Sequence, residues 1–254
     1  MLCRFLADSQ ASYNAITSFW AIDPQHAWMA GYTNVINDRG RLLQYDGTRQ
    51  DGGSKWKSVE LFHAPVPWGV DSLYVAAADD IWIGGLDMLT HWNGTTWTNV
   101  APIKDMYFID LWGSSKSDIW ATADDSPYTA KVRKVFHYDG ARWTQASVEG
   151  GRIWGTSASA VWIVNANVLQ RWDGKAWTSS PMPAQANVRK TWGTGPNDIW
   201  TVGDGGQILH YDGAKWTQHE SGTTHDLKSL WGTGTGDVFA GGTHGTIVRR
   251  RAAN

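Results

Sequence analysis

One unit of about 40 residues recurs six times along this chain, and each copy carries aromatic residues at the same offsets. The aromatic residues that anchor the six copies are Trp20, Tyr74, Trp112, Trp154, Trp192 and Trp231. Eight residues after each anchor comes a second aromatic, at Trp28, Trp82, Trp120, Trp162, Trp200 and Phe239. Because a period of about 40–45 residues with aromatic and glycine markers is typical of propeller blades, the repeat predicts an all-β, six-bladed β-propeller.

Each copy is expected to form one blade of four antiparallel strands. In the fifth copy, short β-prone runs surround Trp192, Trp200 and Leu209, and turn residues separate them. An Asp-Gly pair such as Asp212-Gly213 then predicts a hairpin, since a type I′ turn needs positive φ at both central residues. Four residues after the Asp or Asn of this pair comes an outer-strand tryptophan, at Trp97, Trp143, Trp177 and Trp216. No segment keeps a helical hydrophobic period over three turns.

The sixth copy stops before its outer strand, and the N-terminus is expected to supply it. An outer-strand aromatic precedes the next anchor by 15 residues in three copies, and Phe5 precedes Trp20 by the same 15 residues. We therefore expect residues 3–6 to complete the last blade. Residues 1–254 would then form one closed propeller domain without a free sheet edge.

Charge and hydropathy exclude several classes of partner. The net charge of −2 argues against nucleic-acid binding, and the short basic run 249–251 is expected to be solvated. No apolar run approaches the roughly 20 residues that span a bilayer, so membrane insertion is not expected. The first residues lack the apolar core of a secretion signal, which leaves open a cytoplasmic location or a leader outside this sequence. The single cysteine, Cys3, permits no internal disulfide.

Most of the 18 tryptophans are expected to be structural. Seventeen of them fall on repeat columns, where packing between neighbouring blades explains them most simply. Trp68 matches no column and follows Pro65 and Pro67 in the connection between the first two blades. Because prolines stiffen this loop, Trp68 is a candidate ligand platform. A side chain folded back to cap the ring is the alternative.

Candidate ligand residues lie where the copies disagree. Two residues before the anchors, near the expected mouth of the central channel, the copies carry Ser18, Ser72, Asp110, Arg152, Lys190 and Ser229. The charged residues Asp110, Arg152 and Lys190 come from consecutive blades and could converge into a polar site, or they could form a solvated salt-bridge cluster. Hinges and connections expected on the same face add three residues, namely Asp204, His225 and His244.

Motifs for catalysis are absent from the sequence. There is no nucleophile elbow, no phosphate-binding loop and no histidine or cysteine spacing typical of a metal site, so we expect no cofactor and no metal. Histidines 91, 137 and 210 alternate with apolar residues along the third strand of their blades. This period of two indicates structural or solvated side chains rather than catalytic ones.

The repeat design resembles known protein families. The segment Trp192–Trp200, together with residues 203–206 and 210–213, resembles the Trp-rich propeller repeats of bacterial exported or surface proteins. It is also similar to tectonin-type and fucose-binding lectin propellers, and the resemblance covers essentially the whole chain. It implies a secreted or cell-surface protein that binds sugars in grooves between blades. No individual sugar-binding residue can be transferred from those lectins.

Three functions remain open at this stage. A non-catalytic, lectin-like carbohydrate-binding module is the main interpretation, because aromatic platforms suit sugar faces and several weak sites act together. A protein–protein interaction scaffold that uses the variable face is the alternative. A hydrolase or lyase at the channel mouth would need Asp110, Arg152 or Lys190 to hold its substrate, and no nucleophile or base has a defined partner. A glycan or a protein is thus the expected partner, and the sequence leaves the oligomeric state open.

Overall fold

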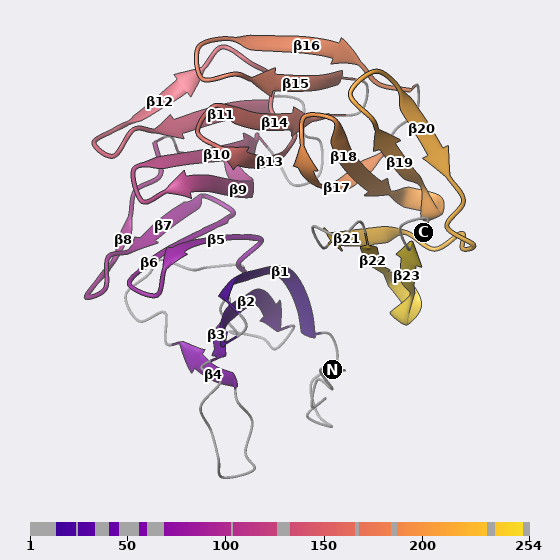
Figure 1. The fold of residues 1–254 in the computed structure, drawn as a ribbon. Helices are drawn as coiled ribbons and strands as arrows, with labels where there is room; N and C mark the ends of the chain where they lie inside the picture. Colours follow the sequence, from indigo (N-terminus) through magenta and orange to yellow (C-terminus); the bar gives the residue numbers. More distant parts are fainter. Residues whose placement is uncertain are drawn as a thin grey trace. The chain divides into compact units, whose positions relative to one another are not determined.

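A computed structural model describes most of the chain. The described residues are 14–23, 25–33, 41–45, 56–59, 69–102, 104–125, 133–165, 168–183, 187–232 and 237–250. They contain 23 β-strands and two single-turn 3₁₀ helices (Figure 1). The chain divides into two compact units, and each is described by itself. The first unit contains residues 1–111 and 123–132, and the second contains residues 112–122 and 133–254.

The strands form six antiparallel sheets, and each sheet corresponds to one copy of the repeat. The first two sheets contain β1 (Asn14–Asp23), β2 (His26–Thr33), β3 (Arg41–Tyr45) and β4 (Trp56–Val59), then β5 (Ser72–Ala77), β6 (Asp80–Gly85), β7 (Met88–Trp92) and β8 (Trp97–Asn99). The third and fourth contain β9 (Tyr107–Ser115), β10 (Asp118–Asp124), β11 (Arg133–Tyr138) and β12 (Trp143–Ala146), then β13 (Arg152–Ser157), β14 (Ala160–Val164), β15 (Val168–Trp172) and β16 (Trp177–Pro181). The fifth contains β17 (Val188–Gly195), β18 (Asp198–Gly203), β19 (Ile208–Tyr211) and β20 (Trp216–His219).

The sixth sheet has three strands among the described residues, β21 (Leu227–Gly232), β22 (Val238–Gly242) and β23 (Ile247–Arg250). In every sheet the strand order follows the chain, so each blade is a simple meander. The predicted blades of four antiparallel strands are therefore confirmed in five sheets. Residues 3–6, which were expected to add the fourth strand to the last blade, lie outside the described residues, so this closure stays a prediction.

The predicted hairpins form, but their turns are longer than expected. In the fifth blade, Tyr211 pairs with Trp216, so the loop has four residues, 212–215, rather than two. Only Gly213 in this loop has positive φ, at 96°. A carboxylate oxygen of Asp212 accepts the backbone N–H groups of residues 214 and 215, both at 2.9 Å. The prediction of a type I′ turn was therefore wrong, because the aspartate side chain stabilises a different turn by bonding its own loop.

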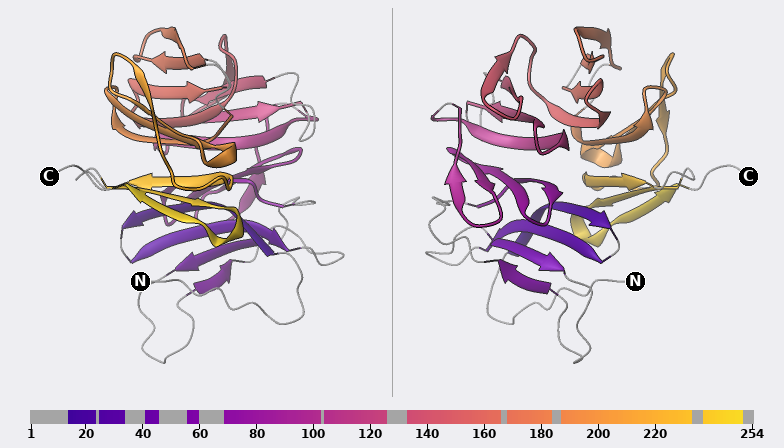
Figure 2. Two further views of the ribbon diagram at one scale, coloured as in Figure 1. Left: turned by 90° about the vertical axis from the view of Figure 1, so that its right-hand side faces the viewer. Right: turned by 60° about the vertical axis from the view of Figure 1, so that its left-hand side comes forward.

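The tryptophan columns pack neighbouring blades together, as the repeat predicted. In the second unit, the rings of Trp172 and Trp177 lie 5.7 and 5.3 Å from that of Trp120 in the preceding blade. An anchor ring also presses on the next blade, since a Cβ added to Gly232 would lie 2.4 Å from the ring of Trp192. Strands β17 and β21, which carry these two residues, lie side by side (Figure 2).

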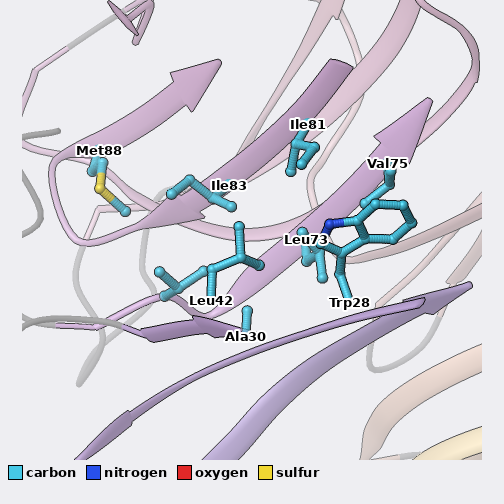
Figure 3. Packing of buried hydrophobic residues seen from close by; sticks show 9 residues of the cluster. Trp28, Ala30, Leu42, Leu73, Val75, Ile81, Ile83 and Met88 are labelled. Carbon is cyan, nitrogen blue, oxygen red and sulfur yellow. The ribbon is translucent and has the colours of Figure 1, made fainter. Parts of the chain in front are cut away.

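In the first unit, an apolar core joins the first two blades (Figure 3). Trp28 and Leu42 of the first blade are fully buried against Leu73 and Ile83 of the second. The same core contains Ala30, two residues after Trp28, and Val75, two residues after Leu73. Such alternate positions of a strand are expected where one face of a sheet packs against another.

A hydrogen-bonded triad joins the second and third strands of the fifth blade. In the fifth blade, a carboxylate oxygen of Asp198 lies 2.8 Å from His210 Nε2 and accepts Trp200 Nε1–H at 2.8 Å. The imidazole also stacks on the indole, with ring centroids 4.0 Å apart. Burial raises the pKa of Asp198, but hydrogen bonds from Thr194, Trp200 and His210 outweigh it and hold that pKa below its usual value. These contacts explain His210 as a structural residue.

A similar approach of histidine and aspartate, together with the ring stack, occurs in two other blades. His137 Nε2 lies 2.6 Å from a carboxylate oxygen of Asp118, and His91 Nε2 lies 3.3 Å from one of Asp80. Both imidazoles stack on the second-strand indole of their own blade. All three histidines therefore pack on an indole of their own blade, which gives each a structural role.

Candidate functional site

The structure places the predicted ligand residues in three locations. Asp110 is buried in β9 of the first unit, with 5% of its surface exposed, whereas Arg152 and Lys190 are half-buried in β13 and β17 of the second unit. Their convergence at a channel mouth therefore stays a prediction. Trp68 lies outside the described residues. The remaining three, Asp204, His225 and His244, lie on neighbouring loops of the fifth and sixth blades.

Two hinges with the same backbone geometry carry this group. The first, a 3₁₀ turn at Asp204–Gly206, joins β18 to β19, and the second, at Thr243–Gly245, joins β22 to β23. In both hinges, the backbone N–H of the residue before the turn donates to the backbone carbonyl of the residue after it. The distance is 3.0 Å from Gly203 to Gln207 and 2.9 Å from Gly242 to Thr246. The two hinges can therefore be compared position by position, with an offset of 39 residues.

The connection that leads into β21 binds both hinges. The N–H of Thr243 donates to the backbone carbonyl of Asp226 at 2.9 Å, and the N–H of Gly205 donates to its carboxylate at 3.1 Å. The adjacent His225 stacks on His244, with ring centroids 4.5 Å apart and planes at 30°. Its Nδ1 lies 2.7 Å from Thr246 Oγ1, which fixes the orientation of the ring.

Arg189 joins the group, although the sequence did not single it out. Its guanidinium donates from Nε and Nη2 to the two carboxylate oxygens of Asp204, at 2.6 and 2.8 Å. The hydrogen bond to Asp204 raises the pKa of Arg189, and the nearby charge of Asp226 adds to this effect. We call Arg189, Asp204, His225, Asp226 and His244 the hinge cluster.

A β-bulge explains why Arg189 rather than Lys190 reaches the hinge. Val188 pairs with Gly203 and Lys190 pairs with Val202, so Arg189 is the extra residue of β17. A bulge changes the direction of a side chain, and regular strand alternation cannot reveal it. Strand β21 has its bulge at the equivalent residue, Lys228, because Leu227 pairs with Gly242 and Ser229 with Gly241.

His244 has a backbone conformation that usually favours glycine. Its φ of 57° and ψ of 27° match those of Gly205, which are 64° and 22°. A non-glycine residue in this left-handed region costs about 1–2 kcal/mol. The side chain is exposed and stacks on His225, so burial does not offset this cost. Backbone cost without a gain in packing is typical of functional positions.

The hinge cluster can form ion pairs and hydrogen bonds with a polar ligand at the surface. It presents imidazole, guanidinium and carboxylate groups on loops held by two rigid sheets. Within the described ranges, no group of three or more His, Cys, Asp or Glu side chains could hold a metal ion. The described residues also include no helix that is long and apolar enough to cross a membrane.

The first unit has a separate surface groove between its two blades. Its volume is about 380 Å³, and Gln44 and Val59 of the first blade line it together with Asp79, Trp92 and Trp97 of the second. The two indoles lie 5.4 Å apart across the hairpin and are half-buried. This groove therefore combines aromatic faces with an amide and a carboxylate.

Comparisons with known proteins support the fold. The sequence matches no protein-family model and no curated protein. Among solved structures, the chain is similar to YCF48 bound to D1 peptide, with 15% identity, a TM-score of 0.65, and coverage of 94% of this chain and 78% of that one. It is also similar to the WD40 β-propeller domain of Doa1, with 10% identity, a TM-score of 0.61, and coverage of 93% and 92%.

A third similar structure is the extracellular domain of a putative one-component system from B. thetaiotaomicron. The identity is 14% and the TM-score 0.65, with 94% of this chain covered and only 33% of that one. At these identities the likeness concerns the fold alone. Together with the six sheets, it shows that this chain is a propeller repeat protein whose fold is a six-bladed β-propeller.

Proposed function

We propose that this propeller is a non-catalytic interaction module that binds a protein or peptide through the hinge cluster. The observation that carries the proposal is the convergence of Asp204, His225 and His244 from separate segments onto one exposed surface, where Arg189 joins them. Loops held by a rigid scaffold are the usual location of binding residues in such folds. This assignment favours the interaction scaffold over the carbohydrate-binding module as the main function.

The chemistry of the hinge cluster suits a polar peptide surface. The guanidinium of Arg189 and the carboxylate of Asp226 can bond main-chain and charged groups, and the exposed imidazole of His244 can donate or accept. A solved structure with a similar fold, YCF48, is described with a bound peptide. That likeness supports a peptide-binding role without identifying the partner of this chain.

Quantitative affinity capture tests the proposal. The wild-type protein, an Arg189→Ala/His225→Ala variant and a Lys175→Ala control would be immobilised and exposed to the same extract. Lys175 lies in the exposed outer turn of the fourth blade, away from the hinges, so it controls for general surface charge. We expect a specific protein to bind the wild type and the control and to be lost from the double variant. A partner bound equally by all three would contradict the assignment to the hinge cluster.

Carbohydrate binding is a second candidate, and the groove of the first unit favours it. Indole faces with nearby amide and carboxylate groups can hold a sugar ring by stacking and hydrogen bonding, and Trp92, Trp97, Gln44 and Asp79 supply these groups. A glycan array and titration by tryptophan fluorescence would test this candidate. Binding that is lost in Trp97→Ala and retained in the Arg189→Ala/His225→Ala variant would support it. The absence of any response at millimolar sugar would exclude it.

A further inference from the structure

We propose that the hinge of the sixth blade is a binding site for a carboxylate group of the bound peptide, formed by His225, His244 and Lys228. The proposal rests on the peptide-binding function proposed above and identifies the chemistry of its ligand. Its starting point is a comparison of the fifth and sixth hinges, which share one backbone geometry but differ in charge.

The fifth hinge neutralises its own cation. Arg189, the bulge residue of β17, binds Asp204 with two hydrogen bonds in a bidentate pair. Such a pair balances the charges of the guanidinium and the carboxylate, so the fifth hinge attracts an external anion weakly, although Arg189 keeps further N–H groups that can bond main-chain carbonyls.

The sixth hinge has a cation at the bulge but no carboxylate at the position of Asp204. Its bulge residue is the exposed Lys228, which is equivalent to Arg189. The position equivalent to Asp204 carries Thr243, and the one equivalent to Gly205 carries His244. The sixth hinge therefore has a positive group at the bulge, a hydroxyl group where the fifth hinge has its carboxylate, and an additional imidazole ring.

The histidine pair is held in a defined arrangement. His225 is fixed by the contact of Nδ1 with Thr246 Oγ1, and it stacks on His244 at 4.5 Å. Both rings are exposed, so each can offer an N–H to a ligand. Glycine would adopt the left-handed conformation of His244 more easily, so the imidazole group is what histidine offers at this position that glycine cannot.

Proton uptake should strengthen this site. Histidine changes charge between about pH 5 and 8, and two stacked imidazolium rings repel each other unless an anion lies beside them. The charged neighbours on the adjoining elements are Asp226 in the connection, Asp204 with Arg189 on the fifth hinge, and Lys228 on β21. Asp226 opposes an incoming carboxylate, whereas Lys228 and the protonated rings attract it. Binding of a carboxylate should therefore weaken as the pH rises, because histidine in general is positively charged only towards the lower end of this range.

Isothermal titration with defined peptides tests the proposal on the full chain. The probe is an acetylated and amidated hexapeptide of glutamate, and its matched control is the hexaglutamine peptide. We expect the glutamate peptide to bind at pH 6 roughly tenfold more tightly than the glutamine peptide, because hydrogen bonds to a charged group are the stronger ones. Its affinity should fall between pH 6 and pH 8. Equal affinity for both peptides would overturn the proposal.

A variant that copies the fifth hinge into the sixth provides the sharpest control. Thr243→Asp combined with His244→Gly restores the residue types of positions 204 and 205, and the fifth hinge shows that this backbone accommodates them. We expect this variant to lose roughly tenfold in affinity for the glutamate peptide, and a Lys215→Ala control in the fifth hairpin to bind like the wild type. Retained affinity in the hinge variant would refute the site.

Two further readouts keep the outcomes separate. Adding the glutamate peptide to the wild-type protein should shift the imidazole proton resonances of His225 and His244, and unshifted resonances would refute the site without any variant. Inorganic phosphate that competes as well as the glutamate peptide at equal concentration would overturn the assignment to a peptide carboxylate. If a captured protein partner is retained by the hinge variant but lost with Arg189→Ala/His225→Ala, the interaction function stands and the carboxylate site fails. If the glutamate peptide binds as expected but no partner is captured, the interaction function fails instead.

Discussion

Replacing Asp198 by alanine should lower the free energy of unfolding far more than Asp237→Ala, the equivalent change in the sixth blade. Asp198 accepts hydrogen bonds from Trp200 Nε1, at 2.8 Å, and Thr194 Oγ1, at 2.6 Å, and contacts His210 at 2.8 Å. Trp200 is only 2% exposed, so its N–H would be left buried without an acceptor. An unsatisfied buried donor costs about 1–3 kcal/mol.

The expected total is modest because water screens part of the network. The Asp198 side chain is 36% exposed, so its contacts with His210 and Thr194 should each contribute only as much free energy as an exposed surface pair does. We therefore expect Asp198→Ala to lower the free energy of unfolding by about 2–3 kcal/mol. For a chain of this length, this corresponds to a fall in Tm of about 4–12 °C.

The sixth blade supplies the matched control. Asp237 occupies the equivalent position and pairs with Arg249 at 2.5 Å, but the second-strand aromatic is Phe239, which has no N–H to satisfy. Asp237→Ala should therefore cost only about 0.5–1 kcal/mol, as expected for a partly exposed ion pair. The assay is thermal unfolding followed by circular dichroism at pH 7. An equal fall in Tm for both variants would refute the reasoning, because it would show that the indole N–H does not set the cost.

The remaining predictions concern pH and the hinges. Burial, followed by the positive charge of Arg250, lowers the pKa of His219. The contribution of neutral His219 to stability is therefore present above the unfolded-state pKa of about 6.5 and is lost as the pH falls towards the lower folded-state pKa. Tm should fall between pH 7.5 and 5.5, and a His219→Asn variant should show a smaller fall. Gly206→Ala should cost about 3 kcal/mol, because its φ is 76° and a Cβ would lie 2.1 Å from a backbone oxygen, whereas Gly205→Ala, with open space around it, should cost about 1 kcal/mol in the same thermal assay. His244→Gly should leave Tm unchanged or raise it, because relief of the left-handed backbone offsets the added freedom of the unfolded chain; a fall of several degrees would show that the imidazole is structural.

Much of the fold could be predicted because the aromatic residues that pack neighbouring blades recur at constant positions in each copy of the repeat. The constant spacing between anchors such as Trp192 and second-strand residues such as Trp200 reflects their pairing across adjacent strands. The type of hairpin turn could not be predicted from Asp212-Gly213 alone, since the aspartate carboxylate competes for the N–H groups of the loop. Two turn types are compatible with the same pair of residues, and side-chain hydrogen bonding decides between them.

The candidate site was predicted only in part. Asp204, His225 and His244 could be found because hinges and connections of a meander blade share one end of the sheet. Arg189 was missed because a bulge breaks the alternation that assigns residues to faces. A comparison of the copies three residues before each anchor, rather than two, would have found both Arg189 and Lys228.

A crystal structure of the protein with the bound hexaglutamate peptide tests the central claim most directly. We predict a peptide carboxylate within hydrogen-bonding distance of His244 or Lys228 at the hinge of the sixth blade. A peptide seated instead in the groove beside Trp92 and Trp97, or one that leaves both hinges unoccupied, would contradict the claim.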